Sequence, residues 1–341
     1  MKKIIFFALI FILTIPFIFA SGGRERKPTG RITIYTSMYE HVIENIKQDL
    51  QRKFPGCTIE FVYGGTSRIQ AMVAAEQAAG RLGCDILMVA DPTYSLELKE
   101  SGMLHSYLSR EAANLAFDYD PDGYWYPVRI SNMVLAFNPE RHTRANLPSS
   151  FQSFANDSRV RGVISMSNPR ISGTAVSTIT ALKDMYGYEY FNALGRQDIR
   201  FYYGSDDAIS KLESGEHRVI MILEESILRR RQQGSRLEVI YPTDGIVMIP
   251  SPIMIINNRW NANRNTRSAQ AITDWFLSEE GQNSIVNGWM HSVRTDFSRI
   301  PHDSRPTREI RENSISINWE NIYRQRDEVR DRFEESIANR R

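Results

Sequence analysis

The chain has 341 residues, and its 42 Lys and Arg against 40 Asp and Glu leave a formal net charge of +2. This near balance excludes the strongly basic footprint of a nucleic-acid-binding protein. The composition, 42% hydrophobic, is typical of a globular protein, and the length is sufficient for two domains that each bury their own core.

The first 22 residues have the layout of a secretory signal peptide, in which two lysines precede an apolar run and small residues follow it. We expect cleavage shortly after Ala20. Because Ile18 stands where a small residue is preferred, an uncleaved anchor is the alternative. Pro16 and a run close to the lower limit of about 17 residues for a span favour the signal peptide. Residues 23–30 are then a linker before the folded part.

Two cysteines, Cys57 and Cys84, are present, and export would permit a disulfide between them. Each stands at the start of a predicted strand, so both lie at the same end of the predicted sheet. The sequence leaves two alternatives open, which are a bridge and two buried free thiols.

Strand and helix patterns alternate in the first part of the chain. Residues 31–37, 57–65 and 85–92 are β-rich runs, and the segments 38–54 and 66–83 between them have helical patterns. This alternation predicts parallel βαβ units in an open sheet. In such sheets, ligands bind outside the carboxyl ends of the strands.

A second α/β segment covers roughly residues 140–245, and long extended runs at 124–139 and 246–258 flank it. We therefore predict an α/β protein of two lobes, with two mostly parallel sheets joined by two crossover strands and a ligand cleft between the lobes. The predicted parts are residues 31–130 and 251–300 for lobe 1, 131–250 for lobe 2 with the hinge strands, and 301–341 for a C-terminal connection and helix.

With these parts in this order, the chain resembles the periplasmic solute-binding proteins of ABC importers, in the two-crossover class that includes ferric-ion and phosphorylated-sugar binders. The matching segments span nearly the whole mature chain. They are RITIYTS (31–37), SNPRISGTA (167–175), YPTDGIVMIPSPIMI (241–255), FLSEEGQNSIVNGWMHSVRTD (276–296) and INWENIYRQRDEVRDRFEESI (317–337). The resemblance implies a two-lobed periplasmic protein that closes on a small ligand and delivers it to a permease in the inner membrane.

The positions of two tyrosines, Tyr202 and Tyr203, bear on whether the ligand is ferric iron. In family members that bind ferric ion, the tyrosine pair follows the strand that corresponds to residues 217–223, and this sequence has Glu224 and Glu225 there. Tyr202 and Tyr203 belong to the preceding strand, where alternation points one ring at each face of the sheet. Ferric iron is therefore kept as the alternative ligand, and no metal ligands are predicted.

Hydroxyl and amide donors precede three predicted helices at the cleft side of the sheets. Helix amino termini carry unsatisfied N–H groups and a positive partial charge, so they bind phosphate. The same residue types are ordinary helix caps, each worth about 1 kcal/mol, but three such termini together favour an oxyanion site. The candidate donors are Thr36, Ser37, Thr66, Ser67, Ser172, Gly173 and Thr174.

The second lobe offers acceptors where its strands end, and the candidates there are Ser205, Asp206 and Glu224. Carboxylates repel a dianionic phosphate, so we expect them at a hydroxyl-rich end of the ligand. In the alternative interpretation, Asp206 only caps the following helix and interacts with its dipole. Glu224 would then be a solvent-exposed residue at the start of its helix. Arg129, on the first crossover, is read either as a phosphate partner or as a member of a surface ion pair.

These features predict the substrate-binding component of an ABC importer that captures a phosphorylated sugar such as a hexose phosphate. We expect a periplasmic monomer without a cofactor, whose partners are the ligand and the permease. A cleft enzyme acting on a small phosphorylated compound is the alternative of another class. The short catalytic motifs G-x-S-x-G, G-x-x-x-x-G-K-[ST] and H-E-x-x-H are absent from the sequence, which disfavours it.

Overall fold

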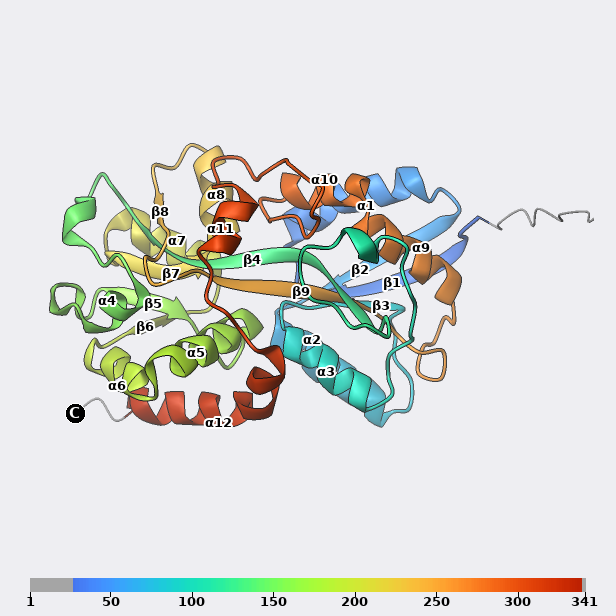
Figure 1. Cartoon of the computed structure of the whole chain (residues 1–341), viewed down its shortest axis with the longest axis horizontal. Helices are drawn as coiled ribbons and strands as arrows, with labels where there is room; N and C mark the ends of the chain where they lie inside the picture. The colour runs from blue at the N-terminus through green and yellow to red at the C-terminus, as the bar shows by residue number, and fades with distance from the viewer. Residues whose placement is uncertain (1–26, 339–341) are drawn as a thin grey trace, which may run out of the picture.

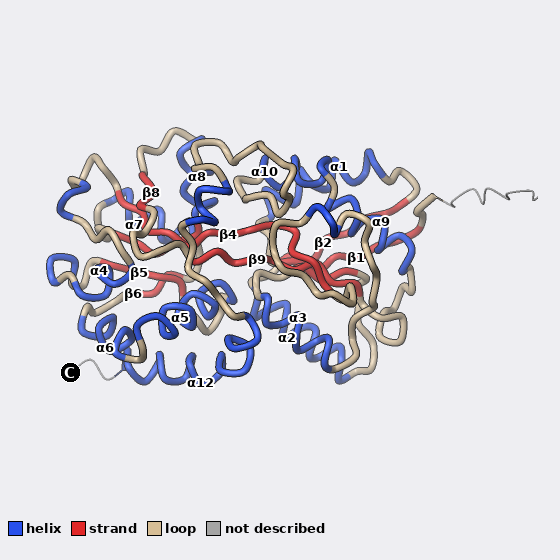
Figure 2. Tube along the Cα trace, in the orientation of Figure 1, coloured by secondary structure: helices blue, strands red, loops and turns tan. Residues whose placement is uncertain are grey.

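Two long strands, β4 (Trp125–Phe137) and β9 (Val247–Ile255), run side by side through the middle of the protein and connect its two lobes (Figure 1). They pair antiparallel, from Trp125 opposite Met254 to Met133 opposite Val247. The computed structural model describes residues 27–338. Both strands are buried along nearly their whole length, because helices cover the sheet on both faces (Figure 2).

Lobe 1 contains the first three strands of the chain. In the sheet, β2 (Cys57–Tyr63) pairs with β1 (Gly30–Thr36), which pairs with β3 (Ile86–Met88), and both pairs are parallel. β3 then pairs antiparallel with β9. The helices of this lobe are α1 (Glu40–Lys53), α2 (Thr66–Ala78), α3 (Pro92–Glu100), α9 (Thr266–Leu277) and α10 (Glu279–Asn287).

Lobe 2 repeats this arrangement on the other side of the hinge. β4 pairs antiparallel with β7 (Val219–Leu223) and β8 (Glu238–Ile240), and parallel pairs continue the sheet through β5 (Ile164–Ser167) to β6 (Arg200–Tyr202). Its helices are α4 (Phe151–Asn156), α5 (Gly173–Tyr186), α6 (Glu189–Arg196), α7 (Ser205–Ser214) and α8 (Glu224–Gln232). The predicted two-lobed α/β architecture with two crossover strands is confirmed.

The sequence has a continuous helical pattern over residues 268–288, but the structure has two helices there, because the chain turns sharply at Ser278. The Ser278 hydroxyl donates to the Trp275 carbonyl at 2.7 Å and accepts from the Gly281 amide at 3.3 Å, which ends α9 and caps α10. A Cβ atom on Gly281 would lie 2.0 Å from the Trp275 oxygen, so only glycine fits this turn.

The last two helices are α11 (Thr307–Glu312) and α12 (Trp319–Ala338). The four apolar residues of α12 that recur at helical spacing are all buried, and the helix contacts α5 and α6 of lobe 2 as well as α3 of lobe 1 (Figure 1). These residues are Ile322, Val329, Phe333 and Ile337. The closing helix therefore spans both lobes.

Cys57 and Cys84 are both buried free thiols, and they belong to different hydrophobic clusters. Burial raises the pKa of each thiol. Of the two alternatives that the sequence leaves open, the structure has the free thiols. The predicted signal peptide lies outside the described residues, and within residues 27–338 we find no helix that is long and apolar enough to span a bilayer.

Candidate functional site

The carboxyl end of β1 has two neighbouring hydroxyl residues, of which Thr36 is fully buried and Ser37 is half-buried. Thr36 ends β1, and its Oγ1 accepts a hydrogen bond from the Met38 amide at 3.1 Å. Ser37 follows, and its Oγ accepts from the Ala90 amide at 2.9 Å. Because both hydroxyls accept from the backbone, each keeps its O–H proton for another acceptor.

The amino terminus of α5 in lobe 2 meets the amino terminus of α2 in lobe 1. A Cβ atom on Gly173 would lie 2.8 Å from Thr66 Cγ2, 3.0 Å from the Ala90 oxygen and 3.0 Å from Asp91 Cβ. Only glycine permits this approach without a shift of the neighbouring chain. The structure thus brings together Thr66 and Gly173, two candidates that lie more than 100 residues apart in the sequence.

The other candidates on this side serve the helix ends and the contact between lobes. Ser172 caps α5, because its Oγ accepts from the Ala175 amide at 3.2 Å, and it lies 3.0 Å from Thr174 Oγ1. The Ser67 hydroxyl donates to the Arg170 carbonyl at 3.1 Å, across the gap between α2 and lobe 2. Ser67 is therefore already engaged in a contact between the lobes.

Tyr39, just before α1, marks a second polar region between the lobes. Burial and the Glu225 carboxylate raise the pKa of its phenol, whereas the nearby hydroxyls of Ser226 and Ser205 lower it, and the net shift is upward. Ser205 belongs to the first turn of α7, and Ser226 belongs to the first turn of α8. The amino termini of these two helices of lobe 2 therefore face Tyr39.

Arg129 lies in the same region and is only 3% exposed. Its Nη1 donates to the Met290 sulfur at 2.9 Å, and its Nε has no partner among the described residues. Burial lowers the pKa of Arg129, and the negative charge of Glu225 opposes that shift. Glu225 accepts from the Ser131 hydroxyl at 2.9 Å, and burial raises the pKa of its carboxyl although Arg129 lowers it.

Glu224 does not share these surroundings, although it is the next residue. Its carboxylate accepts from Asn132 Nδ2 at 2.7 Å and from Ser304 Oγ at 2.6 Å, lies 3.0 Å from His291 Nε2, and also accepts from the Tyr241 hydroxyl. Burial raises the pKa of Glu224, but the contacts with His291, Asn132 and Ser304 together hold it below its usual value. Both glutamates are buried, so the alternative of a solvated helix start is wrong.

Asp206 lies on the surface, in the first turn of α7. Its side chain is 84% exposed and pairs with Arg229 at 2.6 Å, while the neighbouring Asp207 pairs with Lys211 at 3.4 Å. Both aspartates are in the first turn of α7, where a negative charge interacts favourably with the positive end of the helix dipole. The structure therefore separates Asp206 from the buried region that contains Glu225.

The tyrosine pair points in two directions, as strand alternation predicts. The Tyr202 hydroxyl is buried and donates to the Met221 carbonyl at 2.8 Å, whereas Tyr203 is 71% exposed. The two phenols cannot converge on one ion in this arrangement. Within the described part of the chain, no group of three or more His, Cys, Asp or Glu side chains is placed to hold a metal.

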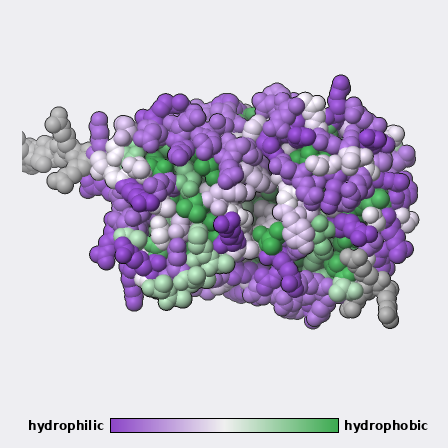
Figure 3. Space-filling model, turned by 180° about the vertical axis from the view of Figure 1, so that it is seen from behind, coloured by the Kyte–Doolittle hydropathy of each residue, from purple (hydrophilic) through white to green (hydrophobic). Residues whose placement is uncertain are grey.

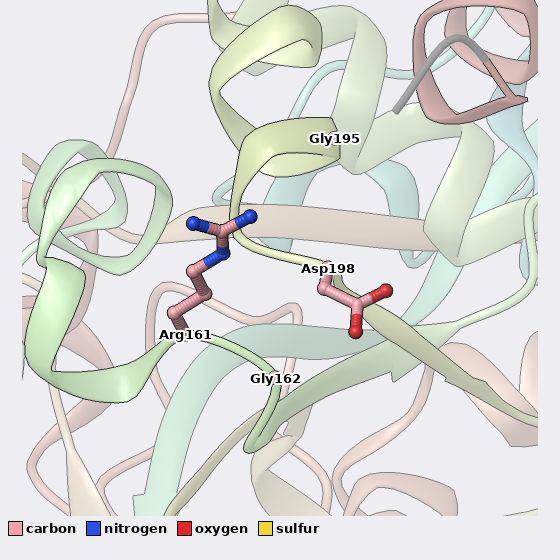
Figure 4. Close-up of a pocket in the computed structure, with 4 residues that line it drawn as sticks. All are labelled: Arg161, Gly162, Gly195 and Asp198. Carbon is pink, nitrogen blue, oxygen red and sulfur yellow. The ribbon is translucent and has the colours of Figure 1, made fainter. Parts of the chain in front are cut away.

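A cavity of about 500 Å³ lies away from this region, and Figure 4 shows it between two loops of lobe 2. It is lined by Arg161 and Gly162, which precede β5, by Gly195 in the last turn of α6, and by Asp198, which precedes β6. It thus opens at the amino ends of strands whose carboxyl ends face the cleft. Seen from behind, the surface is mostly hydrophilic and is hollowed near its middle, where the lobes meet (Figure 3).

Residues that matter in this geometry were only partly predictable. Thr36, Ser37, Thr66 and Gly173 are candidates from the sequence because small polar residues before helices are a recognisable signal. Glu225 and Ser226 were not chosen, because nothing local distinguishes Glu225 from Glu224. For Arg129, the sequence offers one signal of a special role, which is a single charged residue inside a long apolar run.

Comparisons with known proteins agree with this architecture. The family described as bacterial extracellular solute-binding protein matches residues 84–323. Over 276 residues, the chain is 22% identical to an uncharacterized protein of Haemophilus influenzae, covering 77% of this chain and 76% of that one.

Two solved structures show the same fold at low sequence identity. One is the periplasmic binding protein AfuA from Actinobacillus pleuropneumoniae with fructose-6-phosphate bound, at 20% identity and a TM-score of 0.78, covering 91% of this chain and 99% of that chain. The other is iron-bound HitA from Pseudomonas aeruginosa, at 18% identity and a TM-score of 0.77, covering 89% and 99%. The chain therefore belongs to the family of bacterial extracellular solute-binding proteins.

Proposed function

We propose that this protein captures a small phosphorylated sugar, of the hexose phosphate type, between its lobes and delivers it to a permease in the inner membrane. The observation that carries the proposal is the close approach of the α2 and α5 amino termini at Thr66 and Gly173. Because the junction itself has no room for another atom, a phosphate would lie beside it and contact the two helix ends from different lobes. Ligand binding would then favour the closed arrangement.

The phosphate end is built from uncharged donors. The first turns of α2 and α5 have N–H groups without intrahelical partners and a positive partial charge, and Ser37 adds a hydroxyl proton. Asp91 is the nearby carboxylate, but it already accepts from Thr93 Oγ1 at 2.6 Å and from Gln70 Nε2 at 3.0 Å. Ordered backbone and neutral hydroxyls supply affinity for an anion without a large reorganisation.

The sugar hydroxyls would bind at the second polar region, around Tyr39 and Glu225. A carboxylate accepts hydrogen bonds from hydroxyls, and Glu225 is the buried acid that faces the space between the lobes. Asp206, on the surface, would contact only the outer part of a ligand. Glu224 would support the hinge rather than the ligand, because four side chains already surround its carboxylate.

Ferric iron is the second candidate, because iron-bound HitA shares the fold. The separation of Tyr202 from Tyr203 argues against it, since a ferric site needs converging anionic oxygens. A cleft enzyme acting on a phosphorylated compound is the weakest candidate, since Ser37 accepts from a backbone amide and makes no contact with a base in the described residues. The protein would act in the periplasm after export by its amino-terminal segment.

Isothermal titration calorimetry with glucose 6-phosphate tests the phosphate end. Ser37→Ala and Thr66→Ala should each weaken binding about tenfold, which corresponds to about 1.4 kcal/mol for a hydrogen bond to a charged acceptor. Ser210→Ala is the matched control, because its hydroxyl only donates to the Asp206 carbonyl within α7. Unchanged affinity in both cleft variants would contradict the placement, and native mass spectrometry showing bound iron instead of an ester would contradict the ligand.

A further inference from the structure

Helix α10 of lobe 1 ends in a turn that has a tryptophan where glycine is usual. The Trp289 amide donates to the Val286 carbonyl at 3.0 Å. The Met290 amide donates to the Ile285 carbonyl at 3.4 Å. These two hydrogen bonds form a Schellman motif, in which the residue at the Trp289 position is left-handed and is most often glycine. Trp289 has this left-handed conformation, with a φ of 63°.

This backbone conformation is unfavourable for a bulky side chain. Glycine adopts it freely, because it has no Cβ atom to crowd the backbone. The chain does have a glycine one residue earlier, but close packing requires it there, since a Cβ atom on Gly288 would lie 2.7 Å from Val42 Cγ1. Residues in such conformations persist where their surroundings hold them, and they are frequent in segments that bind or move. The contacts of the Trp289 side chain are therefore of interest.

The Trp289 side chain contacts both lobes. Its ring packs against His41 of α1, with the ring centroids 5.8 Å apart, and His41 stacks on Tyr39 at 5.6 Å. Both of these rings belong to lobe 1. The indole Nε1 donates to Gln232 Oε1 at 2.7 Å, and Gln232 is the last residue of α8 in lobe 2. Lobe 1 thus holds the ring, and the indole N–H binds lobe 2, on the side of the crossover strands where α8 and α10 lie (Figure 1).

The surroundings of this hydrogen bond allow it to break and form again. Gln232 is exposed and Trp289 is half-buried, so water can replace either partner when the lobes separate. A cavity of about 320 Å³ lies beside the two side chains, and Asn287 and Arg299 also line it. Within the described part of the chain, the Gln232 side chain makes no other hydrogen bond. The contact is therefore reversible, and it depends on the distance between the lobes.

We propose that Trp289 is a positioning residue for cleft closure, whose indole N–H binds Gln232 when the lobes approach and stabilises the closed arrangement. The inference goes beyond the proposed function, because it holds for any ligand that the cleft takes. The rings of lobe 1 orient the indole in advance, so little side-chain freedom is lost when the hydrogen bond forms. A contact made only in the closed arrangement shifts the equilibrium toward it and raises the affinity for a ligand that binds that arrangement.

Trp289→Phe and Gln232→Met test the proposal. Phenylalanine keeps a ring beside His41 but has no N–H donor, and methionine has nearly the length of glutamine but no amide oxygen. Small-angle scattering of the ligand-free protein should give a larger radius of gyration for each variant. Calorimetry should show about a fivefold loss of affinity for glucose 6-phosphate, the size expected for one hydrogen bond. The double variant should lose no more than either single variant, because both changes remove the same bond.

Trp260→Phe and Gln233→Met are matched controls. Trp260 is also half-buried and packs against a cluster within lobe 1, and Gln233 is the exposed neighbour of Gln232. Neither control should change the radius of gyration or the affinity.

Three results would overturn the proposal. One is an unchanged radius of gyration in both variants, and another is a set of affinity losses that multiply in the double variant. The third is a lower melting temperature for Trp289→Phe without a change in scattering, which would make Trp289 only a part of the helix end. If the wild-type protein does not bind glucose 6-phosphate, the proposed function fails, and the scattering measurements still decide whether Trp289 acts in closure.

Discussion

At the scale of single residues, Glu224 and Glu225 show how neighbours in sequence acquire different chemistry. Both begin α8 and both are buried. Glu224 lies among hydrogen-bond donors that stabilise its charged form, so its pKa is lowered. Burial disfavours the charged form of Glu225, and its contacts offset less of this cost, so its pKa is raised. The two neighbouring residues therefore have opposite pKa shifts because different side chains surround them.

These opposite shifts predict opposite pH dependence. A lowered pKa means that Glu224 contributes stability above its unfolded pKa of about 4.3, which is lost as the pH falls through the lower folded value. For Glu225, the raised pKa means that its contribution is present below the unfolded pKa and lost as the pH rises through the folded value. Glu224→Gln should therefore lower the melting temperature at pH 7, whereas Glu225→Gln should raise it or leave it unchanged.

Thermal unfolding of both variants between pH 3 and pH 8 checks this. The gap between Glu224→Gln and the wild type should shrink as the pH falls, and the gap for Glu225→Gln should also shrink, with the opposite sign. Matched exposed changes such as Glu312→Gln should shift the curves by little, since surface ion pairs contribute about 0–1 kcal/mol. Curves for the two buried variants that shift in the same direction would contradict the assignment.

At the scale of elements, the break between α9 and α10 depends on a contact that periodicity cannot reveal. The apolar residues continue at helical spacing through residue 288, so the pattern indicates one helix. The chain instead turns at Ser278, where Gly281 packs against the backbone of Trp275 and Phe276. The turn folds α10 back so that it contacts both α9 and α1.

Gly281→Ala should therefore destabilise the protein. The added methyl group would lie 2.0 Å from the Trp275 oxygen and 2.8 Å from Phe276 Cα, so backbone must move. Overpacking of this kind costs about 1–3 kcal/mol and should lower the melting temperature by a few degrees. Gly204→Ala is the control, because nothing lies within 4 Å of its added Cβ atom. Equal melting temperatures for the two variants would show that the turn can relax.

At the scale of the whole molecule, α12 connects the lobes with two kinds of contact. Val329, Phe333 and Ile337 pack in the core of lobe 2. Toward lobe 1 the contacts are polar: Arg326 donates to Thr93 Oγ1 at 2.9 Å and pairs with Glu97, and the Tyr323 hydroxyl donates to Glu100 at 2.8 Å. Apolar packing holds the helix on lobe 2, and the polar contacts can break when the lobes separate.

Arg326→Ala should weaken ligand binding several-fold with little change in melting temperature, because it removes contacts that form only when the lobes are together. Calorimetry with glucose 6-phosphate and small-angle scattering of the ligand-free protein measure the two consequences, and the radius of gyration should increase. Arg330→Ala is the control, since Arg330 pairs with Asp327 on the same helix. A fall in affinity without any change in scattering would contradict a role in closure.

Local patterns were sufficient for much of this protein. Alternating strands and helices predicted the α/β lobes, two long apolar runs predicted the crossovers β4 and β9, and period-two alternation separated Tyr202 from Tyr203. The apolar stripe of α12 was also visible in the sequence. These features depend on neighbours within a few residues, so the sequence determines them directly.

Tertiary structure decided the rest, because the deciding contacts join distant segments. The opposite pKa shifts of Glu224 and Glu225 depend on His291 and Arg129, which lie on other elements. The meeting of Thr66 with Gly173 depends on how the two lobes pack. Burial and charge pairing are properties of the assembled fold, so no local pattern could show that Arg129 would be buried with an unpartnered donor between the lobes.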